Sequence, residues 1–295
     1  MLSFGRAIFI GILQGITELF PISSLGHSVL IPALLGWDQL VKSEDKNESF
    51  YLAFLVALHL ATAIALFIYF RKDWGKIAGG LVDSARERRI TSPNARLGML
   101  LIVATIPAGL TGLAFEHALR TLFAKPLAAA VFLTINGVIL LAGEAMRRCV
   151  TVAVPSSVPG VMETKEVGRS IESLTFVEAV FIGIAQIFAL FAGISRSGIT
   201  MVAGLLRGLN HEDAARFSFL LATPIIFAAG LYKLPDLLGH NGDGVRGQVL
   251  VGALCAGVSA YLAVRFLMRF FETRTLTPFA IYCLVVGGAC IVRFA

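Results

Sequence analysis

Long apolar runs separated by short polar segments set the pattern of the chain. Each run is close to the roughly 20 residues that a helix needs to cross the hydrocarbon core of a bilayer. The alternating segments of about ten residues that are typical of a lipid-facing barrel do not occur in the sequence. The pattern predicts an all-α polytopic membrane protein with about six transmembrane helices, at residues 51–70, 97–115, 126–145, 216–236, 248–270 and 277–294.

Two further apolar stretches are interrupted by residues that break helices. Region 4–35 contains Pro21, Pro32 and several glycines, and region 176–209 contains the turn-like sequence AGISRSG. An interior proline removes a helical hydrogen bond, and clusters of serine and glycine favour turns. Each region is therefore predicted to be a re-entrant helical hairpin, because irregular backbone at membrane depth needs protein or a water-filled cavity around it.

The two hairpins are related in sequence. FIGILQGITELFPISSLGHS, from Phe9, aligns without a gap with FIGIAQIFALFAGISRSGIT, from Phe181. The first copy alone carries Glu18 and His27, and the second alone carries Arg196. Charged groups are costly inside a membrane and usually functional there, so the diverged copies predict one composite site. The first four residues are identical, as are the pairs Gln14/Gln186, Ile22/Ile194, Ser23/Ser195 and Gly26/Gly198.

Composition supports the same class of protein. The 295 residues are 57% hydrophobic and only 15% charged, whereas soluble domains carry about 25% charged residues. The net charge of +6 comes from Lys and Arg that cluster between apolar runs. This distribution is typical of cytoplasmic loops and does not indicate a nucleic-acid partner. The four cysteines have no metal-ligand spacing, so neither a zinc site nor a disulfide framework is expected.

Loop charges predict the topology. Three crossings separate the hairpins, and this odd number makes the second hairpin enter from the opposite face. We therefore expect a single transmembrane domain, 1–295, built as an inverted repeat with its site near the midplane. The predicted outer loops are 37–50, 116–125 and 236–247, and the predicted inner loops are 71–96 and 146–175. The predicted repeats are about 1–146 and 176–295, joined by a linker at 150–173.

The first hairpin offers an acid, hydroxyls and an imidazole. Gln14 and Glu18 are four residues apart and share a helix face. Glu18 is a candidate metal ligand or general base, or a structural partner of an arginine. Ser23, Ser24 and His27 lie in one turn, where a serine can act as a nucleophile beside a histidine, or the histidine can accept a phosphoryl group itself.

The second hairpin offers a guanidinium group, hydroxyls and turn amides. Arginine binds tetrahedral oxyanions with two parallel donors, and successive turn amides can form an anion-binding nest. The alternative is a structural ion pair with the acid of the first hairpin, and the two interpretations are compatible. The candidate substrate-binding residues are Ser23, Ser195, Arg196, Ser197, Gly198 and Thr200.

Two more polar side chains, His59 and Asn136, fall inside predicted crossings. Each can line a cavity or form an interhelical hydrogen bond. The sequence leaves both interpretations open.

With these residues assembled, the chain resembles the bacterial undecaprenyl-diphosphate phosphatases of the bacitracin-resistance type over nearly its whole length. The resemblance implies hydrolysis of undecaprenyl diphosphate to undecaprenyl phosphate and phosphate, which recycles the lipid carrier for peptidoglycan synthesis. It also implies a divalent metal ion (Mg²⁺ or Ca²⁺) and a place in the bacterial cytoplasmic (inner) membrane. The matching elements are Gln14–Glu18, Pro21–His27, Ser195–Gly198, FSFLLATP at Phe217–Pro224 and PFAIY at Pro278–Tyr282.

The chain departs from the family pattern at two positions. Gln14 stands where many relatives have Glu, so a second metal-binding carboxylate is missing. Ala192 stands where a proline is usual, so the second turn is expected to be less rigid.

The sequence thus predicts an integral-membrane phosphatase. Arg196 and the hydroxyls beside it would hold the diphosphate, and Gln14 and Glu18 would hold the metal ion. The attacking group would be His27, Ser24 or a water molecule activated by Glu18. The expected partners are a polyprenyl diphosphate and membrane lipids, without nucleic acid, and a homodimer is left open. The alternative function is a secondary transporter or lipid-carrier flippase, because inverted repeats with broken helices are common among carriers.

Overall fold

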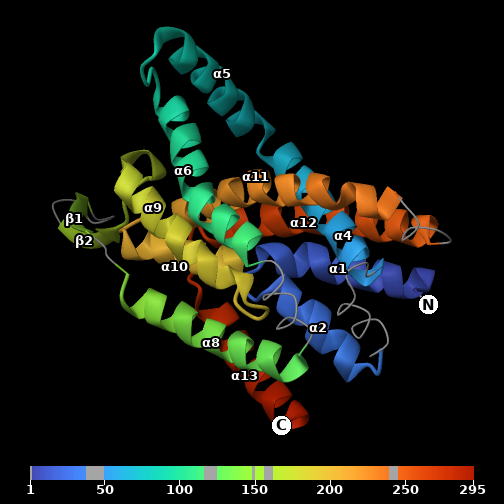
Figure 1. Cartoon of the computed structure of the whole chain (residues 1–295). Coiled ribbons are helices and arrows are strands. Elements are labelled where there is room, and N and C mark those ends of the chain that lie inside the picture. Colours follow the sequence, from blue (N-terminus) through green and yellow to red (C-terminus); the bar gives the residue numbers. More distant parts are fainter. Residues whose placement is uncertain (1, 38–49, 116–124, 148–149, 156–161, 239–244) are drawn as a thin grey trace.

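The computed structural model describes residues 2–37, 50–115, 125–147, 150–155, 162–238 and 245–295. Helices account for most of this part of the chain (Figure 1). The helices are α1 (Phe4–Leu19), α2 (Ser24–Leu34), α4 (Phe50–Tyr69), α5 (Arg71–Glu87), α6 (Pro93–Ala114), α8 (Pro126–Ala145), α9 (Phe176–Ala185), α10 (Arg196–Leu206), α11 (His211–Leu238), α12 (Arg246–Phe270) and α13 (Thr277–Phe294). Two short 3-10 helices, η2 (Ile171–Ser173) and η3 (Gln186–Leu190), flank α9.

The predicted all-α polytopic class is confirmed. Among the described residues, α6, α8, α11, α12 and α13 are long and apolar enough to cross a membrane. A sixth span is formed if α4 is taken together with α5, which continues from it after a bend of 80°. The chain is therefore a multi-pass membrane protein. The predicted outer loops 37–50 and 116–125 fall almost wholly on residues outside the described ranges. Half of the third, 236–247, also lies outside them, and its other residues include the end of α11 and the start of α12.

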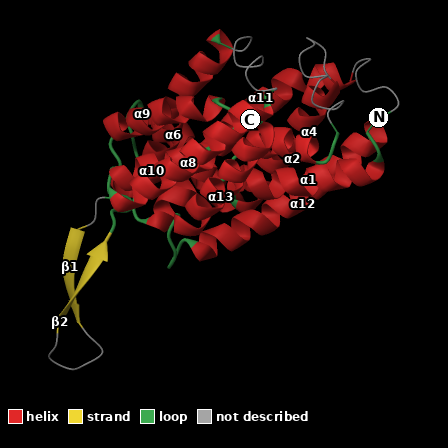
Figure 2. Ribbon diagram, turned by 90° about the horizontal axis from the view of Figure 1, so that it is seen from below, coloured by secondary structure: helices red, strands yellow, loops and turns green. Residues whose placement is uncertain are grey.

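Two segments that the sequence treated as loop or linker have regular structure. Helix α5 occupies most of the basic segment 71–96, because Ile77, Gly80 and Ser84 recur on one face and are buried. In the linker, β1 (Val150–Pro155) and β2 (Met162–Val167) pair antiparallel, from Val150 opposite Val167 to Pro155 opposite Met162. This β-hairpin projects away from the helices (Figure 2).

The first broken region is a hairpin whose two ends lie together. α1 and α2 are joined at Phe20–Ser23, and Trp37, just after α2, returns to the start of α1. The Trp37 ring lies 5.9 Å from the Phe9 ring, centroid to centroid, and the Arg6 guanidinium lies 4.9 Å from its centroid. The chain therefore leaves this hairpin at the level where it entered.

The second broken region, α9–η3–α10, is also a closed hairpin. The backbone N–H of Arg169, before the hairpin, donates to the Gly208 carbonyl, which follows it, at 2.6 Å. The N–H of Asn210 donates back to the Arg169 carbonyl at 3.1 Å. In Figure 1 the two hairpins come from opposite sides of the bundle, α1 and α2 from the right and α9 and α10 from the left.

Glycine lets each hairpin pack closely on a crossing helix. A Cβ added to Gly11 of α1 would lie 2.3 Å from the carbonyl oxygen of Gly252 in α12. A Cβ added to Gly183 of α9 would lie 2.3 Å from the carbonyl oxygen of Ala104 in α6. Since such distances are impossible for a real side chain, both helix pairs pack backbone against backbone.

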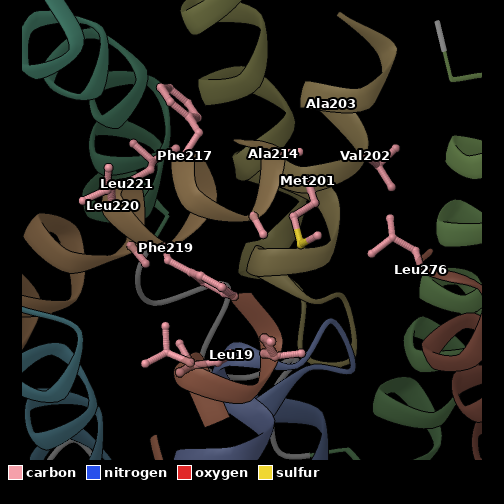
Figure 3. Close-up of a cluster of buried hydrophobic side chains, with 14 of the residues drawn as sticks. Leu19, Met201, Val202, Ala203, Ala214, Phe217, Phe219, Leu220, Leu221 and Leu276 are labelled. Atoms are coloured by element: carbon pink, nitrogen blue, oxygen red, sulfur yellow. The ribbon is translucent and has the colours of Figure 1, made fainter. Parts of the chain in front are cut away.

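The main hydrophobic core lies beside the hairpin turns. It joins Leu19, at the end of α1, to Met201 of α10 and to Phe217 and Phe219 of α11, all fully buried. Figure 3 shows these side chains in one cluster, with Leu19 below those of α10 and α11. Close packing of this kind leaves little freedom for the turns that it supports.

Candidate active site

A cavity of about 330 Å³ lies where the two hairpins meet. Its walls come from α2, α4, η3 and α11 and are largely apolar, with Val29, Leu55 and Ile226 among the lining residues. Its polar lining includes Glu18, Ser23, Ser24, His59, Ser195 and Arg196. The cavity therefore combines an apolar wall with a small polar centre, which is the usual composition of a ligand site.

Glu18 makes hydrogen bonds to several of these polar residues, which together form the polar centre of the cavity, and it is 7% exposed. Its Oε1 accepts a hydrogen bond from Arg196 Nη2 at 2.7 Å, which joins the two hairpins. Its Oε2 accepts hydrogen bonds from Ser24 Oγ at 2.5 Å and Gln14 Nε2 at 3.0 Å. The structure thus brings together four of the residues that the sequence selected, Gln14, Glu18, Ser24 and Arg196.

Arg196 begins α10 and uses only part of its guanidinium group on Glu18. Its Nη1 is buried and has no hydrogen-bond partner among the described residues, while its Nη2 holds Glu18. A buried donor without an acceptor is costly, and more so on a charged group. The guanidinium is therefore arranged to receive an anionic oxygen that enters the cavity.

Ser23 ties the two hairpin turns together. It has a left-handed backbone, with φ of 70°, and its Oγ caps α2 by accepting from the N–H of Gly26 at 3.2 Å. The same Oγ accepts from the N–H of Gly193 in the other turn at 3.1 Å. Gly193 has φ of 113°, a conformation that L side chains rarely adopt, so its glycine lets the turns meet.

Asn136 of α8 clamps both turns from behind. Its Nδ2 donates to the Pro21 carbonyl at 3.0 Å, and its Oδ1 accepts from the N–H of Ser195 at 3.0 Å. Of the two interpretations left open by the sequence, the structure assigns Asn136 to interhelical hydrogen bonding. A fully buried side chain that bonds both turns fixes their relative position.

His27 lies away from the group around Glu18. Helix α2 presents positions 24, 25, 28 and 29 to the cavity, and His27 falls on the opposite side of the helix. Its Nδ1 lies 2.7 Å from the Ser23 carbonyl oxygen, and its Nε2 lies 2.8 Å from the hydroxyl of Tyr282. Both ring nitrogens are therefore engaged, and the ring stacks on that of Tyr282.

Three of the six candidate substrate-binding residues do not line the cavity. Ser197 Oγ donates to the Phe20 carbonyl at 3.3 Å, and Thr200 Oγ1 pairs with Ser218 Oγ at 2.6 Å. The N–H of Gly198 is taken by the Oγ of the serine that caps α10, at 3.1 Å. These groups fasten α10 to α11 and to the first turn, while Ser23, Ser195 and Arg196 reach the cavity.

His59 is the functional candidate that the sequence did not assign. It comes from α4, and its Nε2 lies 3.3 Å from Glu18 Oε2. The signal in the sequence was a histidine inside an apolar run, which alone could not reveal its partner. Ser28 also lines the cavity and was not selected.

The donors beside Glu18 are of types that hold divalent metal ions. Gln14 is 2% exposed, and its Oε1 has no hydrogen-bond partner among the described residues. Within those residues no cluster of three or more His, Cys, Asp or Glu side chains occurs. A metal site here would therefore depend on the amide oxygen of Gln14 together with the Glu18 carboxylate.

The fold and the site define a polytopic helical membrane protein in which the turns of two hairpins bring a carboxylate, a guanidinium and hydroxyl groups to one cavity. The family model for bacitracin resistance protein BacA matches residues 7–289. The chain belongs to this family.

Curated relatives match along nearly their full length. Undecaprenyl-diphosphatase 2 of Frankia alni is 54% identical over 338 aligned positions, covering 100% of this chain and 98% of the relative. Undecaprenyl-diphosphatase of Mycolicibacterium paratuberculosis is 55% identical, with coverage of 100% and 98%. Undecaprenyl-diphosphatase 2 of Chromobacterium violaceum is 44% identical, with coverage of 96% and 95%. The chain is thus similar to proteins named for one activity.

Proposed function

We propose that this chain is an integral-membrane phosphatase that hydrolyses undecaprenyl diphosphate to undecaprenyl phosphate and phosphate. It would act in the bacterial cytoplasmic membrane, recycle the lipid carrier for peptidoglycan synthesis and confer bacitracin resistance. The observation that carries the proposal is the meeting of Arg196, Glu18 and Ser24 in one cavity. The names of the relatives support the same activity.

Arg196 is the diphosphate-binding residue of this proposal. Its partnerless Nη1 donates to a phosphate oxygen, while Nη2 stays on Glu18. Ser23 and Ser195 lie beside it on the cavity wall. Ser197, Gly198 and Thr200 act indirectly, because they hold α10 in place. A fixed guanidinium stabilises the charge that develops on the transferred phosphoryl group.

Ser24 is the nucleophile that the geometry favours over His27. Glu18 accepts the Ser24 proton along their 2.5 Å hydrogen bond, while Ser24 Oγ bonds to the terminal phosphorus. The bond from that phosphorus to the bridging oxygen breaks, and undecaprenyl phosphate departs with the proton from Glu18. Water then attacks the phosphorus of the phosphoserine and gives a proton to Glu18. The bond between that phosphorus and Ser24 Oγ breaks, inorganic phosphate leaves, and the proton on Glu18 restores the Ser24 hydroxyl. His27 supports the turn through the carbonyl of Ser23.

Glu18 and Gln14 would hold a divalent metal ion, Mg²⁺ or Ca²⁺, through their oxygen atoms. The partnerless, buried Oε1 of Gln14 supports this assignment. When bound, such an ion neutralises negative charge on the diphosphate.

The apolar part of the cavity suits the start of the prenyl chain. It is lined by Leu25 and Val29 of α2 and by Ile225 and Ile226 of α11. With apolar walls from both helices, only the headgroup needs to reach the polar centre, and the rest of the chain stays among membrane lipids. A nucleic-acid partner is not expected, and a homodimer remains a prediction.

The halves 1–146 and 176–295 are proposed to be an inverted repeat. The aligned glycines Gly11 and Gly183 each pack against the backbone of a crossing helix, in α12 and α6 respectively. The aligned serines Ser23 and Ser195 each cap the second helix of their hairpin. A carrier or flippase could share this architecture. The serine hydrogen-bonded to a carboxylate and the names of the relatives favour the phosphatase.

Phosphate release from C55 and C15 prenyl diphosphates in detergent tests the proposal, because no transmembrane flux exists there. Arg196→Ala should lower turnover by at least about a hundredfold, as expected when a transition-state donor is lost. Arg293→Ala is the matched control, since Arg293 lies at the end of α13 beside Phe294. It should keep normal turnover. Near-normal turnover by Arg196→Ala, at an unchanged melting temperature, would overturn the assignment.

A further inference from the structure

The imidazole of His59 faces the same carboxylate oxygen that Gln14 and Ser24 already share. His59 Nε2 lies 3.3 Å from Glu18 Oε2, and the side chain is 20% exposed to the cavity. The histidine belongs to α4, so it approaches Glu18 from outside both hairpins. It is thus a third element brought to the polar centre.

The other ring nitrogen fixes which atom of His59 is available. Nδ1 lies 2.7 Å from the carbonyl oxygen of Leu55, which can only accept, so Nδ1 carries the hydrogen. The lone pair of the neutral ring is then on Nε2 and points at Glu18. Histidines that bind metals almost always donate their second N–H to a carbonyl or carboxylate in this way.

Two facing lone pairs repel, so this contact is favourable when a cation, either a proton on the ring or a metal ion, lies between Nε2 and Oε2. For a proton, the distance of 3.3 Å is long, because charged N–H donors lie about 2.7–2.9 Å from carboxylate oxygens. For a metal ion it is suitable, because two ligand atoms each about 2.0–2.2 Å from one ion lie about 3 Å apart. Gln14 presents Nε2 to Glu18 in this structure, and turning its amide over would exchange that hydrogen bond for Oε1 as a third metal ligand.

We infer that His59, with Glu18 and Gln14, forms a mixed nitrogen and oxygen site that prefers a transition-metal dication such as Mn²⁺ over Ca²⁺. Calcium takes oxygen ligands, whereas imidazole suits first-row transition metals. The neutral amide of Gln14 adds to this preference by removing a carboxylate. The inference rests on the proposed function only in placing a metal ion beside Glu18.

Mn²⁺ binding to the metal-stripped protein in detergent tests this site without substrate. Electron paramagnetic resonance counts bound ions, and electron spin-echo modulation detects a directly coordinated ¹⁴N nucleus. Wild type should bind one Mn²⁺ with a nitrogen signal. His59→Gln should lose that signal and bind at least about tenfold more weakly. His59→Asp should keep a site but shift its preference toward Ca²⁺.

His211→Gln is the matched control, because His211 Nε2 also meets a carboxylate, that of Glu144, at 3.0 Å and away from the cavity. This variant should bind Mn²⁺ as wild type does. A nitrogen signal that persists in His59→Gln, or unchanged Mn²⁺ affinity in that variant, would overturn the inference. Phosphate release by wild type is measured in a separate assay. Failure of the metal-site inference therefore changes only the Mn²⁺ binding result, and failure of the proposed function changes only the phosphate-release result.

Discussion

At the scale of residues, the site depends on how each helix is rotated about its axis. Glu18 and Arg196 both sit next to a turn, so their meeting could be predicted from the duplicated sequence. The direction in which the His27 side chain points could not be predicted in this way, because it depends on Tyr282 of α13. The contact between His59 and Glu18 also depends on the rotation of α4, which an evenly apolar helix does not reveal.

Ser24→Ala separates the two attacking groups that the geometry leaves in the cavity. If Ser24 is the nucleophile, the variant should lose at least about a thousandfold in turnover, because no covalent intermediate can form. If water activated by Glu18 attacks instead, turnover should fall by less than about tenfold. Phosphate release in detergent measures the difference, and trapping of a phosphoserine in wild type checks it independently.

The control for this prediction is Ser28→Ala, one helical turn further along α2. Ser28 Oγ donates to the backbone carbonyl of Ser24 at 2.8 Å and does not touch Glu18. This variant should stay within about threefold of wild type. An equal loss in both variants would contradict a special role for the Ser24 hydroxyl.

At the scale of elements, hydropathy predicted the crossings because apolar length is what a bilayer demands. The missed elements were those whose stability has another source. Helix α5 has a polar, basic surface and only a narrow buried face, around Ile77. The strands β1 and β2 are stabilised by pairing with each other. Their segments carry mixed charges and proline, and this composition predicts a linker.

The glycine contacts of α1 and α9 give a prediction at this scale. Gly11→Ala and Gly183→Ala should each destabilise the fold, because the new methyl would meet backbone atoms that cannot move aside. Overpacking of this kind costs about 1–3 kcal/mol. Thermal unfolding in detergent measures the effect as a lower melting temperature.

Gly109→Ala is the control for these variants, since nothing lies within 4 Å of a Cβ at this position of α6. It should be neutral or raise stability slightly, as alanine is favoured over glycine in helices by about 0.5–1 kcal/mol. Equal melting temperatures for all three variants would contradict backbone packing at Gly11 and Gly183.

At the scale of the whole molecule, one polar centre is assembled from two hairpins that each close on themselves. The first closes through Trp37 and the second through Arg169. Because neither hairpin crosses the bundle, its turn can be held deep in the protein while its ends stay together. The Asn136 clamp and the Ser23 hydrogen bond then join the turns. This arrangement lets two half-sites with different chemistry face one cavity.

The inverted repeat makes a prediction about sidedness. Leu35, at the end of the first hairpin, and Glu172, before the second, are both exposed and suit single-cysteine labelling in a background without the native cysteines. A membrane-impermeant maleimide applied to intact spheroplasts should label Leu35→Cys but not Glu172→Cys, since the loop charges place the first end outside and the second inside. Permeabilised cells should label both. Arg89→Cys, between α5 and α6, serves as the inside control and should behave like Glu172→Cys. Labelling of Leu35→Cys and Glu172→Cys from the same side would exclude hairpins of opposite orientation. The composite site would then have to arise without an inverted repeat.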